Sequence, residues 1–186
     1  MKTMIRAIGI VIVLQVLGGC ANSVASLLVD DADQPRFDAL LADPTAIRAF
    51  LADTTIKDHG DPHGTQIEYH GADGRAFLVY PGNLRTVLGF WEVRGPAGSP
   101  RLCYRYPGSV DGVTGDPGDD WECRPAVLRL IDDEIYDGDL IGLRARGRAL
   151  YPRPLPRDIN VSIGEVLLEL GLPPVRVPNK TFRRRN

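Results

Sequence analysis

Residues 84–106, LRTVLGFWEVRGPAGSPRLCYRY, contain the clearest structural pattern of this chain. Apolar side chains alternate on both sides of the segment 95–100: Val87, Trp91 and Val93 before it, and Leu102, Tyr104 and Tyr106 after it. A period of two is typical of strands that bury one face, whereas GPAGSP is typical of a turn. The stretch therefore predicts two strands of an antiparallel sheet, with Cys103 on the face opposite Tyr104.

Further segments on either side of this stretch have strand patterns bounded by turn residues: 66–69, 76–80, 121–124, 127–131 and 140–150. Helical signals occur towards both ends. Pro35 and Asp43-Pro44 mark the starts of two short helices, and Ser162 with Glu165 forms a capping box before a third. This order of elements predicts an α+β fold, a mainly antiparallel curled sheet or partial barrel with short helices at the N- and C-terminal ends.

The first twenty residues have a pattern of their own. Lys2 and Arg6 precede an apolar run from Ile8 to Leu17, and small residues follow the run. This layout is typical of a secretory signal peptide. The run is shorter than the roughly 20 apolar residues that a membrane-spanning helix needs. We therefore expect the chain to be exported.

Leu17-Gly18-Gly19-Cys20 resembles the lipobox of bacterial lipoproteins. That resemblance implies cleavage before Cys20, diacylation of its thiol and attachment to the membrane through the lipid. Ala21 stands where an Asp holds enteric lipoproteins at the inner membrane, which favours the periplasmic face of the outer membrane. The alternative is an ordinary secretory signal cut near Ala25.

The chain is expected to have four parts: a signal peptide (1–19), a tether (20–34), a single disulfide-stapled domain (35–172) and a basic tail (173–186). Its charge is unevenly distributed. Residues 20–139 hold 10 basic and 21 acidic side chains, and residues 140–186 hold 10 and 3. We expect these halves to neutralise one another. A net-acidic protein is a poor candidate for nucleic-acid binding, so no nucleic-acid partner is expected.

Two cysteines remain after Cys20. An even pair in an oxidising compartment predicts a disulfide between Cys103 and Cys123. Two separate buried thiols are the alternative. A metal pair is disfavoured because neither cysteine has another Cys or a His within four residues.

The weak metal candidates are the histidines and an aspartate in and near the polar segment 57–64: His59, Asp61, His63 and His70. Gly60 and Pro62 oppose a helix that would bring two rings together, so a solvated loop is favoured over a metal site. The Gly-rich segment 107–120 also offers oxygen ligands for calcium: Asp111, Asp116, Asp119 and Asp120. These residues lack the spacing of an EF-hand and are common turn formers, so no metal or cofactor is assigned.

Arg144, Arg146 and Arg148 alternate along the strand predicted at 140–150. On one face of a strand, three guanidinium groups could bind an anionic lipid head group or a glycan phosphate. The alternative is that they meet the acidic part of the domain or solvate an edge strand. No nucleophile motif occurs, and no catalytic residue is assigned.

One further resemblance covers roughly residues 73–124. Gly89-Phe90-Trp91, then Leu102-Cys103-Tyr104-Arg105-Tyr106, then Trp121-Glu122-Cys123 is similar to small exported bacterial domains of unknown function. It implies a disulfide-stapled sheet and no activity. We therefore expect a lipid-anchored envelope protein with a binding or assembly role, acting on envelope proteins or on an anionic lipid or glycan. A periplasmic hydrolase or lipid- or glycan-handling enzyme is the alternative. A pocket with perturbed titratable groups would favour that alternative, whereas a flat or filled sheet without such a pocket would favour the binding or assembly role.

Overall fold

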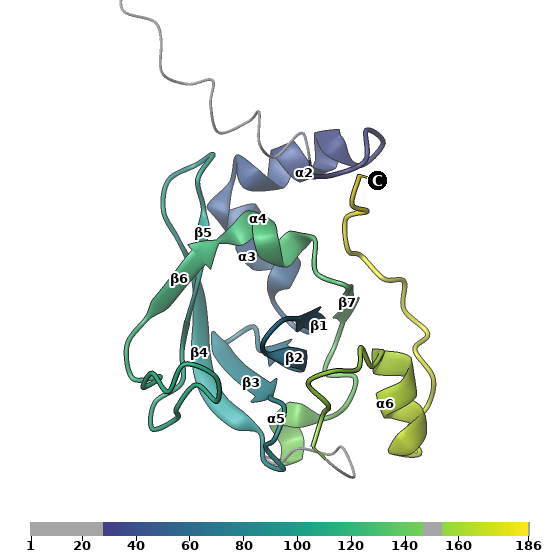
Figure 1. Cartoon of the computed structure of the whole chain (residues 1–186). Coiled ribbons are helices and arrows are strands. Elements are labelled where there is room, and N and C mark those ends of the chain that lie inside the picture. Colours follow the sequence, from purple (N-terminus) through teal and green to yellow (C-terminus); the bar gives the residue numbers. More distant parts are fainter. Residues whose placement is uncertain (1–27, 147–153, 186) are drawn as a thin grey trace, which may run out of the picture.

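The computed structural model describes residues 28–146 and 154–185, and their centre is a seven-stranded antiparallel sheet (Figure 1). The strands are β1 (Thr54–Gly60), β2 (Gly64–His70), β3 (Arg75–Val79), β4 (Val87–Arg94), β5 (Arg101–Arg105), β6 (Glu122–Pro125) and β7 (Glu134–Asp137). Their order in the sheet is β6-β5-β4-β3-β2-β1-β7, and every pair is antiparallel. The sheet curls into a half-barrel, which confirms the predicted α+β fold.

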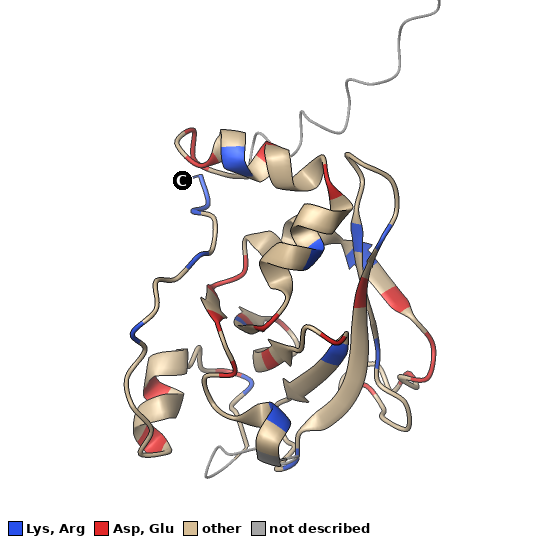
Figure 2. Ribbon diagram, turned by 180° about the vertical axis from the view of Figure 1, so that it is seen from behind, with Lys and Arg blue, Asp and Glu red and all other residues tan. Residues whose placement is uncertain are grey.

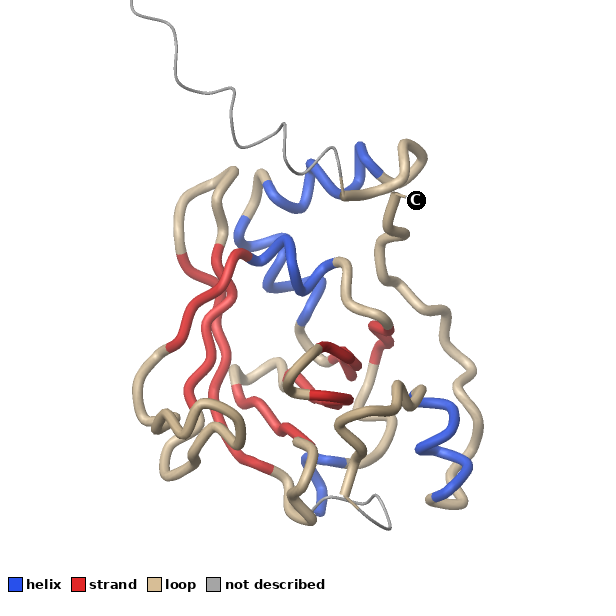
Figure 3. The backbone as a smooth tube through the Cα atoms, in the orientation of Figure 1, coloured by secondary structure: helices blue, strands red, loops and turns tan. Residues whose placement is uncertain are grey.

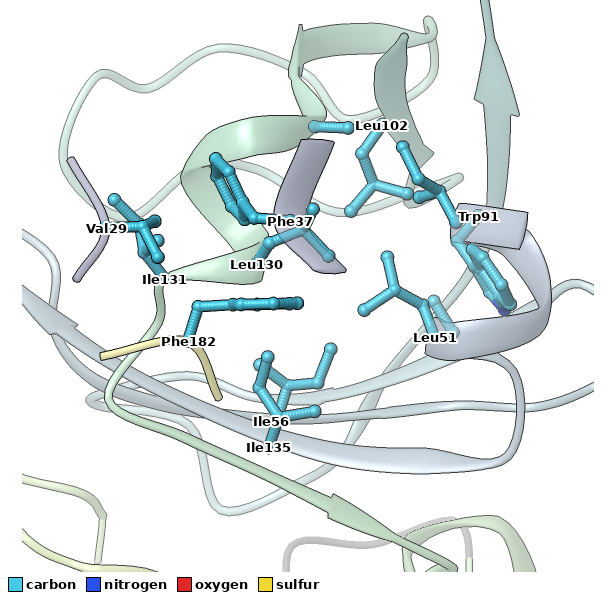
Figure 4. Packing of buried hydrophobic residues seen from close by; sticks show 13 residues of the cluster. Val29, Phe37, Leu51, Ile56, Trp91, Leu102, Leu130, Ile131, Ile135 and Phe182 are labelled. Atoms are coloured by element: carbon cyan, nitrogen blue, oxygen red, sulfur yellow. The ribbon is translucent and has the colours of Figure 1, made fainter. Parts of the chain in front are cut away.

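Three helices cover one end of the inner face of the curled sheet: α2 (Gln34–Leu41), α3 (Pro44–Leu51) and α4 (Ala126–Leu130). Figure 4 shows the core between these helices and the sheet. Phe37, Leu51 and Leu130 come from the helices and are fully buried against Trp91 and Leu102. Because apolar burial is the main favourable term in folding, this core fixes the curl of the sheet.

The outer face of the sheet has a core of its own, formed with α5 (Leu143–Arg146) and α6 (Ile163–Glu169). Its members on the strands include Ile67, Tyr69 and Phe77, and those on the helices include Leu143 and Val166. The middle of the sheet is thus covered on both faces. Consequently, polar side chains that alternate with these apolar ones on β2 are buried too.

The segment after α6 returns along the side of the molecule to α2 (Figure 3). Phe182 is 1% exposed and packs edge-on against Phe37, with ring centroids 5.0 Å apart. A β-bridge joins Val29 to Arg184. Figure 2 shows basic residues along this segment, and Arg183 pairs with Asp33 at 3.4 Å. Part of the basic C-terminal half is therefore neutralised by the acidic N-terminal half.

Several local predictions are confirmed. Asp43 caps α3 by accepting a hydrogen bond from the Thr45 N–H at 2.8 Å. Ser162 and Glu165 form the predicted capping box of α6. Cys103 lies directly opposite Cys123 in the β5–β6 register, and a disulfide joins them across a Cα–Cα distance of 4.0 Å.

The strand predicted at 127–131 is wrong, because this segment forms helix α4. Ala126 and Leu130, four residues apart, are fully buried, whereas Leu128 between them is 51% exposed. That burial pattern has the period of a helix, and short apolar runs do not distinguish the two structures.

The strand predicted at 140–150 is also wrong in its described part, where Leu143–Arg146 forms helix α5. Gly142 has φ +67°, which a strand does not continue through, and Asp139 accepts hydrogen bonds from the Leu143 and Arg144 N–H groups. The polar loop predicted at 57–64 is shorter than expected, because β1 extends to Gly60 and β2 starts at Gly64.

Candidate functional site

A cavity of about 590 Å³ occupies the part of the inner face that the helices leave uncovered. The strand register builds its floor, because Glu68, Leu78 and Val87 lie side by side on β2, β3 and β4. Tyr104 on β5 and residues of β6 and α4 form one wall. The segment 109–118 completes the rim, so residues far apart in the sequence converge on one space.

Where the cavity meets the core, six polar residues form a connected group, here called the buried polar cluster: Glu68, His70, Tyr104, Tyr106, Arg129 and Asp132. All but His70 line the cavity.

Arg129, on α4, connects the members of the cluster. Its guanidinium group donates to the Asp132 carboxylate at 2.7 Å and to the Tyr104 hydroxyl at 3.1 Å. It also lies 3.4 Å from the Glu68 carboxylate. The side chains of Glu68 and Asp132 are only 3% and 7% exposed, so one guanidinium serves two buried carboxylates.

His70 and Tyr106 complete the surroundings of Glu68. The Tyr106 hydroxyl donates to one Glu68 oxygen, and His70 Nε2 lies 3.3 Å from the other and 3.0 Å from the Tyr104 hydroxyl. The imidazole stacks on Trp91 at 4.7 Å. Within the described residues, His70 Nδ1 is buried without a hydrogen-bond partner.

The protonation states of the cluster follow from burial and from the single arginine. Burial alone would raise the pKa of Glu68, but His70 and Arg129 hold it below its ordinary value. Burial raises the pKa of Asp132 from 3.8 to about 7, and Arg129 offsets this only in part. Burial also lowers the pKa of His70 against the opposing effect of Glu68. Near neutral pH, Glu68 therefore keeps its charge while Asp132 exchanges a proton.

Both tyrosines of the cluster remain protonated. Burial raises the pKa values of Tyr104 and Tyr106 well above 10. Their hydroxyl groups are thus available as donors at every pH at which the protein is expected to fold.

The candidate metal-binding residues lie in separate parts of the structure. His63 lines the cavity rim, where its Nδ1 lies 2.7 Å from the Tyr80 hydroxyl. His59 instead contacts the Thr65 hydroxyl at 2.9 Å, and Asp61 lies in the turn between β1 and β2. His70 belongs to the cluster. Residues 28–146 and 154–185 contain no group of three or more His, Cys, Asp or Glu residues that could hold a metal ion.

The candidate calcium residues mostly shape their own loop. Asp111 accepts hydrogen bonds from the Val113 and Thr114 N–H groups, and Asp119 accepts one from the Gly108 N–H. Asp111 and Asp116 also line the cavity.

The anion site predicted from Arg144, Arg146 and Arg148 loses its geometric basis, because Arg144 and Arg146 lie in helix α5 and do not alternate along a strand. Arg144 pairs with Asp73 at 2.7 Å. Arg148 and the lipidation residue Cys20 lie outside the described residues.

The sequence did not single out Glu68 or Arg129 as site residues. Tyr104 and Tyr106 stand out only as alternating residues of a predicted strand, and no pattern in the sequence marks Asp132 as a site residue. One usable signal was Arg129 inside the apolar run AVLRLI, since a charged residue there must find a partner when the run is buried.

The chain matches no protein-family model, no curated protein and no solved structure. Among the described residues, no helix has the length and apolar character to cross a membrane.

Proposed function

We propose that this protein is a lipid-anchored cell-envelope protein whose domain binds a small polar molecule in the cavity on the inner face of the sheet. Binding sites for small molecules are typically concave, with a few polar groups that converge on the ligand. The observation that supports the proposal best is the cavity of about 590 Å³ with the buried polar cluster along its floor and one wall.

The anchor is supported by the sequence alone. Lys2, Arg6 and the apolar run before Leu17-Gly18-Gly19-Cys20 favour export and lipidation. Mass spectrometry of the mature N-terminus tests this, with a diacylated Cys20 as the expected result. Cys20→Ser should release the protein from membranes. An unmodified N-terminus downstream of residue 20 would contradict the anchor.

The binding role is tested by blocking the cavity. Leu128 lines it from α4 and is 51% exposed, so Leu128→Trp should fill the space without entering the core. Leu168→Trp is the matched control, because Leu168 is 80% exposed on α6, outside the cavity. The full chain, purified in detergent, is screened by ligand-observed NMR against amines, amino acids, sugars, nucleosides and dicarboxylates.

We expect at least one compound class to bind the wild type and Leu168→Trp but not Leu128→Trp. A screen with no binder, or with binders that are indifferent to Leu128→Trp, would contradict the proposed function.

A hydrolase is the second candidate, because a pocket with perturbed titratable groups is the feature expected of an enzyme and Asp132 supplies such a group. It ranks second because Arg129 already pairs with the Asp132 carboxylate, at 2.7 Å. A general acid or base works best when its pKa is near the operating pH, and that of Asp132 is about 7. Asp58 supplies a second carboxylate on the same cavity wall. Turnover of nitrophenyl esters, phosphates or glycosides that Asp132→Asn abolishes would support an enzyme. If no such turnover is found, the hydrolase is excluded for these substrates and the binding role remains.

A further inference from the structure

We infer that the ligand of the cavity is a small organic cation, an amine or a guanidinium compound. The inference rests on the proposed function and adds the charge of the molecule that binds. It starts from the ionisable side chains that line the cavity. Besides His63 and three tyrosines, they are six carboxylates and two arginines: Asp58, Glu68, Asp111, Asp116, Glu122 and Asp132, against Arg124 and Arg129.

Neither arginine is free to receive an anion. Arg129 is held by Glu68, Tyr104 and Asp132. Arg124 donates to Glu122 at 2.8 Å on β6. An anionic ligand would have to break one of these pairs, and it would also meet the remaining carboxylates.

Two of the carboxylates do remain open. Among the described residues, neither Asp58 nor Asp116 has a side-chain hydrogen bond or ion pair. They line the same cavity from β1 and from the segment 109–118, so both attract a cation that enters it.

Aromatic rings on the cavity wall suit the same chemistry. The ring faces of tyrosines attract cations, and the protein already uses two of them in this way. Arg129 lies over the Tyr104 ring at 5.4 Å, and Arg157 over the Tyr80 ring at 5.7 Å. Glu68 and Asp132 are buried beside this aromatic wall, whereas Asp116 and Glu122 are exposed at the rim of the cavity.

The protonation of Asp132 reports the potential inside the cavity. Arg129 on α4, Asp58 on β1 and Tyr104 on β5 act on Asp132, and Asp133 is its chain neighbour. Glu68 on β2 pairs with the same Arg129. Asp58 and Asp133 add to the effect of burial in raising its pKa to about 7. A bound cation favours the ionised carboxylate, so binding should release a proton and strengthen as the pH rises through about 7.

The test uses four probes of similar size and different charge: spermidine, agmatine, glucose and succinate. Calorimetry with the full chain in detergent measures each at low and high salt, on either side of neutral pH. We expect the two cations to bind, to bind more weakly at high salt and to bind more tightly at the higher pH. Asp132→Asn should remove the pH dependence.

Asp58→Asn should weaken cation binding by about fivefold, which is typical of one partly exposed charge pair. Asp120→Asn is the matched control, because Asp120 is exposed in the same loop as Asp116 but does not line the cavity. Its cation affinity should be unchanged.

The two proposals fail in different ways. Binding of glucose or succinate but of neither cation, lost in Leu128→Trp, would overturn the charge inference and leave the binding role standing. Cation affinities that Asp58→Asn leaves unchanged would also overturn it. If none of the probes and no compound of the screen binds the wild type, both proposals are wrong.

Discussion

Asp132→Asn should make the protein more stable, although the substitution removes a member of a buried salt bridge. The Asn side chain is nearly the same size as Asp, and its carbonyl oxygen can still accept the hydrogen bond that Arg129 donates at 2.7 Å. The substitution removes a carboxyl group whose charged form is destabilised by burial. We therefore expect the gain to depend on pH.

The magnitude follows from the pKa of Asp132. Burial raises that pKa from 3.8 to about 7. Each pKa unit corresponds to about 1.4 kcal/mol, so the difference between the folded and unfolded states amounts to about 4 kcal/mol. The stability that protonated Asp132 provides is fully present below about pH 4. It is lost as the pH rises, by about 1.4 kcal/mol per pH unit, until the pH passes about 7.

The assay is urea unfolding of wild type, Asp132→Asn and Asp120→Asn between about pH 5 and pH 8, followed by tryptophan fluorescence. His70, whose pKa burial lowers, changes stability in the opposite direction but does so equally in all three proteins. The difference between wild type and Asp132→Asn thus isolates Asp132. Parallel stability curves for these two proteins would refute the reasoning, and so would a variant that is less stable at pH 8.

Three further predictions concern the elements that hold the site. Arg129→Met should cost about 3–5 kcal/mol of unfolding free energy near neutral pH because it leaves Glu68 buried without its counter-ion, and adding Glu68→Gln should recover part of the loss in the same urea assay. Replacing Cys103 and Cys123 together by Ser should cost about 3 kcal/mol, since the bond closes a separation of 20 residues; an unchanged denaturation midpoint would contradict this. Phe182→Ala should cost about 3–5 kcal/mol and lower the melting temperature, which would show that the C-terminal segment belongs to the core in solution.

The sheet could be predicted from the sequence because alternation specifies faces. Tyr104 and Cys103 lie on opposite faces of β5, as their alternation predicts, and Cys103 meets Cys123 across the β5–β6 pair. The strand predicted at 127–131, and the described part of the strand predicted at 140–150, are wrong because short apolar runs fit a helix or a strand equally well. Only the tertiary contacts decide between the two, as the burial of Ala126 and Leu130 shows.

The site could not be predicted, for a related physical reason. In β2 the alternation of Ile67 and Tyr69 with Glu68 suggests one buried and one solvated face. In the structure both faces are covered, by α6 on one side and by α4 on the other, so Glu68 is 3% exposed. A period of two identifies which residues share a face, but it does not tell whether a polar face is solvated or buried against a distant helix.

The buried polar cluster is difficult to explain as a stabilising feature. A buried ion pair often contributes no more stability than apolar residues of similar volume, and here one guanidinium compensates two carboxylates. An apolar core lies directly beside it and could have been continued by apolar side chains at these positions. Destabilising arrangements of this kind concentrate at sites where a ligand or a reaction needs the charges. The cluster lies where the core meets the cavity, so its charges can act on a molecule that enters the cavity.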